Sequence, residues 1–61
     1  MQEYVVLKEL WIEFCSKYSG AMYINKIAHT TKEVDNDNIK ITFSNNEGYQ
    51  MLYNFLQIKK H

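Results

Sequence analysis

The sequence predicts a small α+β domain in which two helices lie on one face of a β-hairpin. Three observations predict this class. Apolar residues recur at helical spacing near both ends of the chain, a segment of strict alternation lies between them, and a cluster of Asp and Asn precedes that segment. We expect the order helix, strand, strand, helix, in two layers. At 61 residues the chain has room for a single small domain, spanning 1–61.

The first helix is expected over Met1–Ser19. Its apolar stripe follows the helical period and consists of Tyr4, Leu7, Leu10, Trp11, Phe14, Cys15 and Tyr18. Glu3, near the start, complements the helix dipole. Gly20 follows the last residue of the stripe, at a place where helices commonly end in a left-handed cap.

The segment Ala21–Val34 is predicted to be a strand. It is rich in residue types that favour β-structure, namely Tyr23, Ile24, Ile27, Thr30, Thr31 and Val34. Its alternation is imperfect, so the strand would need a bulge. A short helix over Ala21–His29 is the alternative, and the sequence leaves that choice open.

A hairpin turn is expected at Asp35–Asn38, because Asp and Asn tolerate left-handed backbone and bond their own main chain. Asn38–Ser44 then alternates cleanly, as a half-buried strand does. Ser44 and Glu47 match a capping box, which predicts a closing helix that runs to about Lys59. The predicted core consists of Leu7, Leu10, Trp11, Phe14, Tyr18, Ile39, Ile41, Phe43, Leu52, Phe55 and Leu56.

Composition argues against several classes of function. The only cysteine is Cys15, so no disulfide forms within one chain, and Cys15, His29 and His61 lack the spacing of a metal site. No cofactor is expected. The seven basic residues are all Lys and are balanced by seven acidic ones, which disfavours a nucleic-acid partner. No apolar run approaches the roughly 18 residues that span a bilayer. With a lone cysteine, this predicts a cytoplasmic chain without a membrane partner.

Two residues could carry catalytic chemistry, and each has a plainer interpretation. His29 could act as a general base beside Glu33 or Asp35, but so small a chain offers little concave volume for a substrate. Cys15 could be a nucleophile, but it lies on the apolar stripe, where burial makes a thiol inert. We therefore expect that the protein is not an enzyme and has no catalytic residues.

The segment Asp35-Asn36-Asp37 has the acidic start of a calcium-binding loop. Such a loop needs a third oxygen ligand and a Gly at fixed positions, which Ile39 and Lys40 occupy in this chain. A turn is the better interpretation.

Surplus apolar residues predict a contact surface. Val5 and Ile12 lie seven residues apart beside the first stripe, and Met51 and Ile58 repeat that spacing in the last helix. Together with Tyr23 and Tyr53, they are the candidate interface residues: Val5, Ile12, Tyr23, Met51, Tyr53 and Ile58. The alternative is that these residues pack within the monomer. Both strands of a lone hairpin also have an open edge, which is a second indication of association.

The sequence therefore predicts a non-enzymatic protein-binding module that acts by occupying a surface, with a second copy or a host protein as its partner. In size and composition the chain is similar to bacteriophage and mobile-element proteins that block a host machine, including anti-CRISPR and other counter-defence proteins. That resemblance implies an inhibitor. The alternative is a small nucleic-acid-binding regulator that would use its lysines and tyrosines, namely Lys26, Lys32, Lys40, Lys59, Lys60, Tyr23 and Tyr53.

Overall fold

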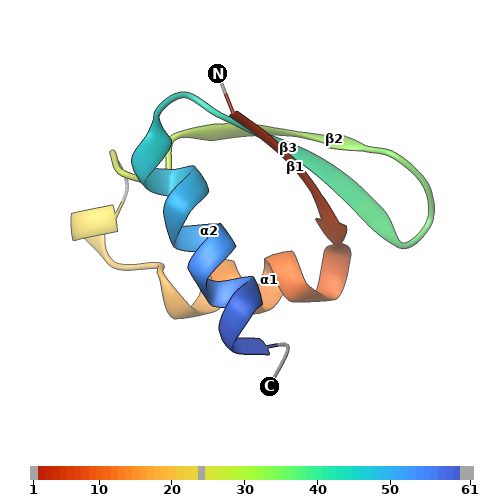
Figure 1. Ribbon diagram of the computed structural model, residues 1–61, viewed down its shortest axis with the longest axis horizontal. Coiled ribbons are helices and arrows are strands. Elements are labelled where there is room, and N and C mark those ends of the chain that lie inside the picture. The colour runs from red at the N-terminus through yellow and green to blue at the C-terminus, as the bar shows by residue number, and fades with distance from the viewer. Residues whose placement is uncertain (1, 24, 60–61) are drawn as a thin grey trace.

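The computed structural model describes residues 2–23 and 25–59. Its elements are, in order, β1 (Gln2–Leu7), α1 (Lys8–Lys17), the 3₁₀ turn η1 (Ala21–Tyr23), β2 (His29–Glu33), β3 (Asn38–Phe43) and α2 (Asn46–Lys59). The three strands form an antiparallel sheet in the order β1-β3-β2, and both helices lie on the same side of it (Figure 1).

The predicted helix–hairpin–helix layout is wrong, although the α+β class holds. The chain does not enter the fold as a helix over Met1–Ser19, because residues 2–7 form a third strand and α1 begins only at Lys8. Met1 lies outside the described residues. The β-branched pair Val5 and Val6 favours extended backbone. The hairpin also leaves one edge of β3 open, and β1 pairs along that edge from Gln2↔Phe43 to Leu7↔Asn38.

The sheet has one covered face and one solvated face. Tyr4 and Val6 of β1 point toward the helices, as do Ile41 and Phe43, which are fully buried in β3. The alternate residues of β1, among them Val5, point to the other face. Each helix covers a different part of the sheet: Trp11 of α1 packs against His29 of β2 and Phe43 of β3, while Tyr49 of α2 packs against Tyr4 of β1.

The segment after α1 is neither the predicted strand nor the alternative helix over Ala21–His29. A 3₁₀ turn at Ala21–Tyr23 leads through a further turn into β2, which is confined to His29–Glu33. Gly20 has no positive φ, so the predicted left-handed cap is wrong as well. Its carbonyl oxygen instead accepts a hydrogen bond from the Tyr23 N–H at 2.9 Å. Ile24 lies outside the described residues.

The turn before β3 is confirmed. The Asp35 carboxylate accepts hydrogen bonds from the backbone N–H groups of Asp37 at 2.8 Å and Asn38 at 2.9 Å, and also from the Asn38 side chain. These bonds favour the charged carboxylate, so they lower the pKa of Asp35, and the Asp37 N–H makes the largest contribution.

The core is largely the one predicted. Buried predicted residues are Trp11, Phe14, Ile41, Phe43, Leu52, Phe55 and Leu56, while Leu10, Tyr18 and Ile39 are half-buried. Leu7 is 42% exposed, so its assignment to the core is wrong. Its place is taken by Val6, because a strand buries alternate residues. Ile27, which was not predicted, enters the core from the turn before β2.

Helix α2 begins differently from the predicted capping box of Ser44 and Glu47. Asn45 is the capping residue: its side-chain oxygen accepts a hydrogen bond from the Gly48 N–H at 3.1 Å. Its amide nitrogen also donates to the Asn25 carbonyl at 3.1 Å. Asn45 therefore fastens the start of α2 to the turn that precedes β2.

Gly48 allows α2 to approach that same turn closely. A Cβ atom placed on Gly48 would lie 2.8 Å from the Lys26 carbonyl oxygen, 2.8 Å from Phe43 Cδ1 and 3.2 Å from the Ile27 Cα. Two of these three neighbours are backbone atoms, so relief of the clash requires the helix or the turn to move.

We expect Gly48→Ala to lower the free energy of unfolding by about 1–3 kcal/mol, the usual cost of overpacking. This would outweigh the gain of up to about 1 kcal/mol in helix propensity. Urea denaturation followed by circular dichroism measures the difference. Gly20→Ala is the matched control, because a Cβ there meets its nearest neighbour only at 3.9 Å. Equal stability of the two variants would show that the approach at Gly48 is not tight.

The lowered pKa of Asp35 predicts a pH-dependent contribution to stability. The folded chain holds the carboxylate in its charged form more strongly than the unfolded chain does. The contribution is therefore complete above the ordinary Asp pKa and is lost as pH falls through the lower pKa of the folded state. We expect the stability difference between wild type and Asp35→Asn to be greatest above pH about 5 and to shrink in acid. Denaturation across a pH series measures this, and a difference that does not change with pH would contradict it.

Candidate functional site

The two outer strands of the sheet expose different backbone groups. The Lys8 N–H donates to the Asp37 carbonyl at 2.8 Å, at the position that continues the β1–β3 register. Hydrogen-bonded pairs alternate along an antiparallel ladder, so the even-numbered residues of β1 bond β3. The N–H and C=O groups of Glu3, Val5 and Leu7 therefore point away from the sheet, along an edge that pairs with no other strand of the described residues.

The opposite edge, at β2, is protected against strand addition. All five residues of β2 are exposed, and two of them, Lys32 and Glu33, are charged. Glu33 lies on the side of the sheet where the helices are, and its carboxylate binds the Lys8 Nζ at 2.9 Å. Charged residues of this kind, including ones that point inward, are how edge strands avoid pairing with other chains.

Strand β1 has less of this protection, because Glu3 is its only charged residue. Its six residues contain no Lys and no Pro, and its register with β3 runs without a bulge. On the outer face, Val5 is 54% exposed and Leu7 is 42% exposed. The one charge of the strand, on Glu3, lies 3.8 Å from Lys40 of the neighbouring strand. The open edge of β1 is therefore mainly apolar and able to accept another strand.

A groove runs beneath this edge, between β1 and the C-terminal half of α2. It has a volume of about 430 Å³. Its lining is mostly apolar and comprises Tyr4, Val5, Val6, Leu7, Leu10, Asn38, Leu56 and Lys59. The one charged side chain among them, Lys59, forms an ion pair with Glu13 of α1. The groove could receive side chains from a strand added to β1.

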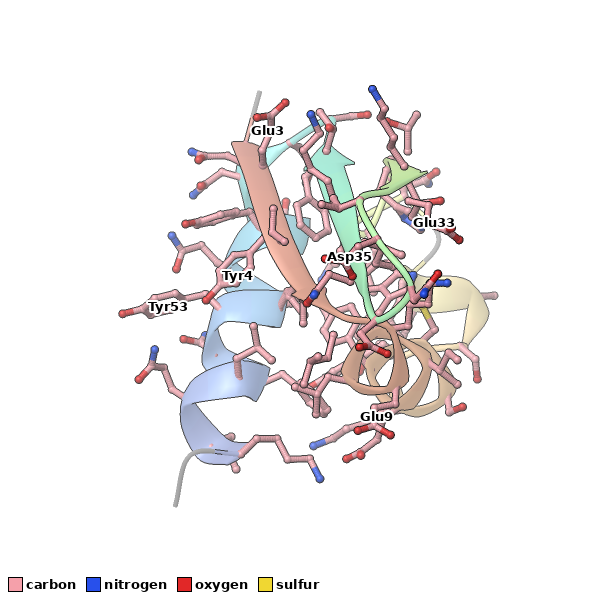
Figure 2. The ribbon with its side chains drawn as sticks, turned by 90° about the vertical axis from the view of Figure 1, so that its right-hand side faces the viewer. Glu3, Tyr4, Glu9, Glu33, Asp35 and Tyr53 are labelled. Carbon is pink, nitrogen blue, oxygen red and sulfur yellow. The ribbon has the colours of Figure 1, made fainter. Side chains whose placement is uncertain are left out.

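The helix beside the groove presents an uncharged stripe. Asn46, Gln50, Tyr53 and Gln57 follow the i, i+4, i+7, i+11 spacing of one helix face. Gln2 of β1 donates to the Asn46 side chain at 3.3 Å, which joins the stripe to the strand. Figure 2 shows Tyr4 and Tyr53 on the same side of the molecule. We call the β1 edge, the groove and this stripe together the β1 side.

The structure divides the six predicted interface residues among different surfaces. Only Val5 and Tyr53 lie on the β1 side, and Leu7, which was assigned to the core, belongs there too. Val5 and Ile12 do not share a helix edge, because Val5 is in a strand. Ile12 is 64% exposed on α1.

The other three predicted residues lie away from the β1 side. Ile58 is 68% exposed and lines a hollow between the two helices. Met51 is half-buried against the core, and Tyr23 packs against Tyr18 with a ring separation of 5.1 Å. In the sequence, the β1 side is indicated by the apolar residues Val5 and Leu7 at alternate positions, but Leu7 also fits the apolar stripe of the predicted helix.

The catalytic arrangement considered for His29 is not formed. Its Nδ1 makes a hydrogen bond with the Ile27 carbonyl, and its ring packs edge-on against Trp11 at 4.9 Å. The Glu33 carboxylate is engaged by Lys8, and Asp35 bonds its own turn. Neither carboxylate is therefore placed to orient the imidazole.

Cys15 and His29 both line a small pocket between α1 and the turn that contains η1. Its volume is about 250 Å³, and Phe14, Tyr18, Tyr23 and Ile27 form apolar walls. Burial raises the pKa of the Cys15 thiol. A thiol with a raised pKa holds its proton at neutral pH and is a poor nucleophile.

The described ranges, 2–23 and 25–59, contain no cluster of three or more His, Cys, Asp or Glu side chains that could hold a metal ion. His61 lies outside them. Within the same ranges, no helix has the length and apolar character needed to cross a bilayer.

Comparison with protein-family models, with curated proteins and with solved structures gave no match.

The raised pKa of Cys15 predicts slow alkylation at neutral pH. We expect the rate of reaction with iodoacetamide at pH 7 to be lower in the folded chain than in the urea-unfolded chain, and to rise with pH through a pKa above that of free cysteine. Mass spectrometry of timed samples measures the rate. A folded chain that reacts at pH 7 as fast as the unfolded one would contradict this and would indicate an activated thiol.

Proposed function

We propose that this chain is a non-enzymatic protein-binding module that acts by adding the open edge of β1 to a strand of its partner. One observation carries the proposal: β1 is less protected against strand pairing than β2, since it has one charged residue and exposed apolar side chains where β2 has two charged residues and no apolar ones. Strand addition of this kind gains affinity from main-chain hydrogen bonds, and pockets for alternate side chains add specificity. In this chain, the main-chain hydrogen bonds would come from the outward N–H and C=O groups of Glu3, Val5 and Leu7. The groove below them would hold the partner's side chains.

The chemistry of the remaining surface supports a binding role over a catalytic one. Cys15 has a raised pKa, and neither Glu33 nor Asp35 is placed to orient His29. A chain whose candidate catalytic side chains are not activated would act on another protein by occupying its surface. Inhibition of a host machine in the cytoplasm, which the resemblance to small phage proteins implies, would be an activity of this type.

The alternative of a nucleic-acid-binding regulator has less support. Lys32 and Lys40 lie opposite one another on the outer face of the sheet, which is a small basic surface. The two tyrosines that would stack on bases are elsewhere: Tyr23 is half-buried against Tyr18, and Tyr53 lies on the β1 side. Lys40 is also close to the Glu3 carboxylate. Affinity for nucleic acid usually requires a larger excess of positive charge.

The proposal predicts that a proline at position 5 abolishes binding and leaves the fold intact. The Val5 N–H points away from β3, so Val5→Pro removes an outward donor without breaking the sheet. Thr31→Pro is the matched control on β2. The Val34 N–H donates to the Asn38 carbonyl, and bonded residues alternate along the strand, so the N–H of Thr31, three residues earlier, points away from β3. Tagged wild type and both variants are incubated with a lysate of the native cell, and retained proteins are quantified by mass spectrometry.

We expect wild type and Thr31→Pro to retain the same partner and Val5→Pro to lose at least nine-tenths of it. Circular dichroism checks that each variant is folded, and Val5→Lys serves as a second block that leaves the backbone unchanged. Retention of the same proteins by wild type and by both folded Val5 variants would overturn the proposal.

A further inference from the structure

The surface around the open edge is electrically neutral. On β1, Glu3 lies beside Lys40 of the same chain, and at the groove, Lys59 is paired with Glu13 of the same chain. The helix stripe of Asn46, Gln50, Tyr53 and Gln57 is uncharged. Such a surface offers no attraction to a strongly acidic or basic partner, whereas two identical neutral surfaces meet without repulsion. The chain as a whole also has no net charge.

The hydrogen-bonding groups of this edge are self-complementary. The outward backbone groups belong to Val5 and to the residues two positions before and after it, Glu3 and Leu7. A two-fold axis at Val5 therefore places Val5 opposite its own copy and Glu3 opposite Leu7, so that all three residues bond. Shifting the register by two residues in either direction leaves one of the three without a partner inside the strand.

The side chains are compatible with the same axis. On the outer face, Val5 meets its copy, and each Glu3 lies beside Leu7 of the other chain, so the two carboxylates stay at opposite ends. On the inner face, Tyr4 lies opposite Val6 above the groove. Aromatic and β-branched pairs of this kind stabilise neighbouring strands.

We infer that the occupant of the β1 edge is a second copy of this chain, paired antiparallel through β1 with the two-fold axis at Val5, to form a six-stranded sheet. This rests on the proposed function and names its partner. The two α2 stripes then face one another beneath the joined strands, on the side that Figure 2 shows at the left.

The required contact area indicates that more than the strand takes part. A stable interface commonly buries on the order of 800 Å² on each partner. The chain exposes 4323 Å², so such an interface would cover about a fifth of its surface. The edge of a six-residue strand is too narrow for this, so the inference requires the groove and Tyr53 to be covered as well.

Cysteine cross-linking of the purified full chain tests both the partner and the register. The background carries Cys15→Ala, so that the only thiols are the introduced ones. Opposed residues in a hydrogen-bonded pair lie about 5.5 Å apart between Cα atoms, within the range of a disulfide. We expect Val5→Cys to form a covalent dimer on mild oxidation at least tenfold faster than Thr31→Cys, the matched control on the other edge. Glu3→Cys and Leu7→Cys should cross-link when mixed, and each much more slowly alone.

Light scattering coupled to size exclusion, over a dilution series, gives the mass of the unmodified chain. A dimer that dissociates on dilution, is lost in Val5→Lys and shows the cross-linking pattern above supports the inference. A monomer at every concentration overturns it, as does a dimer in which Glu3→Cys links to itself as fast as Val5→Cys does. If the chain is monomeric while Val5→Pro still abolishes capture from a lysate, the occupant is a foreign strand: this inference fails and the proposed function stands.

Discussion

The whole structure depends on strand β3, which is bonded along both of its edges. Ile41 and Phe43 of this strand are completely buried. Phe43, at the end of the strand, lies near the rings of Trp11 in α1, His29 in β2 and Tyr49 in α2. Along β3, odd-numbered residues bond β1 and even-numbered residues bond β2. Because β3 is central, β1 and β2 must both be edge strands, and the difference between them decides where another chain could join.

The parts of the fold that were predicted correctly are those whose signal is local. The Asp35 turn, the alternation of β3 and the periodicity of α2 each depend on residues close together in the sequence. Strand β1 was missed because Val5 and Leu7 are apolar on the outer face, so Tyr4, Leu7 and Trp11 also fit a helical stripe. Only pairing with β3, more than thirty residues later, decides between a strand and a helix for this segment. Such long-range pairing is not encoded in local periodicity.

The exposure of some apolar side chains could be predicted from the sequence, but the surfaces on which they lie could not. An excess of apolar side chains correctly indicated exposed ones, since Val5, Ile12 and Ile58 are all more than half exposed. Their grouping depended on the wrong secondary structure, so residues expected on two helix edges lie on separate surfaces. The open backbone edge of β1 could not be seen from side-chain types, because every residue has the same N–H and C=O groups and only the fold determines which are left without partners.

The pairing of the first strand with the third also constrains how the chain is made. Gln2 pairs with Phe43, 41 residues further along. Closing so long a loop costs entropy before any contact repays it, and contacts of high sequence separation slow folding. During synthesis, β1 leaves the ribosome before β3 and must wait, with Val5 and Val6 unpaired, until β3 has emerged. In that interval β1 is an unpaired strand that is exposed to pairing between nascent chains.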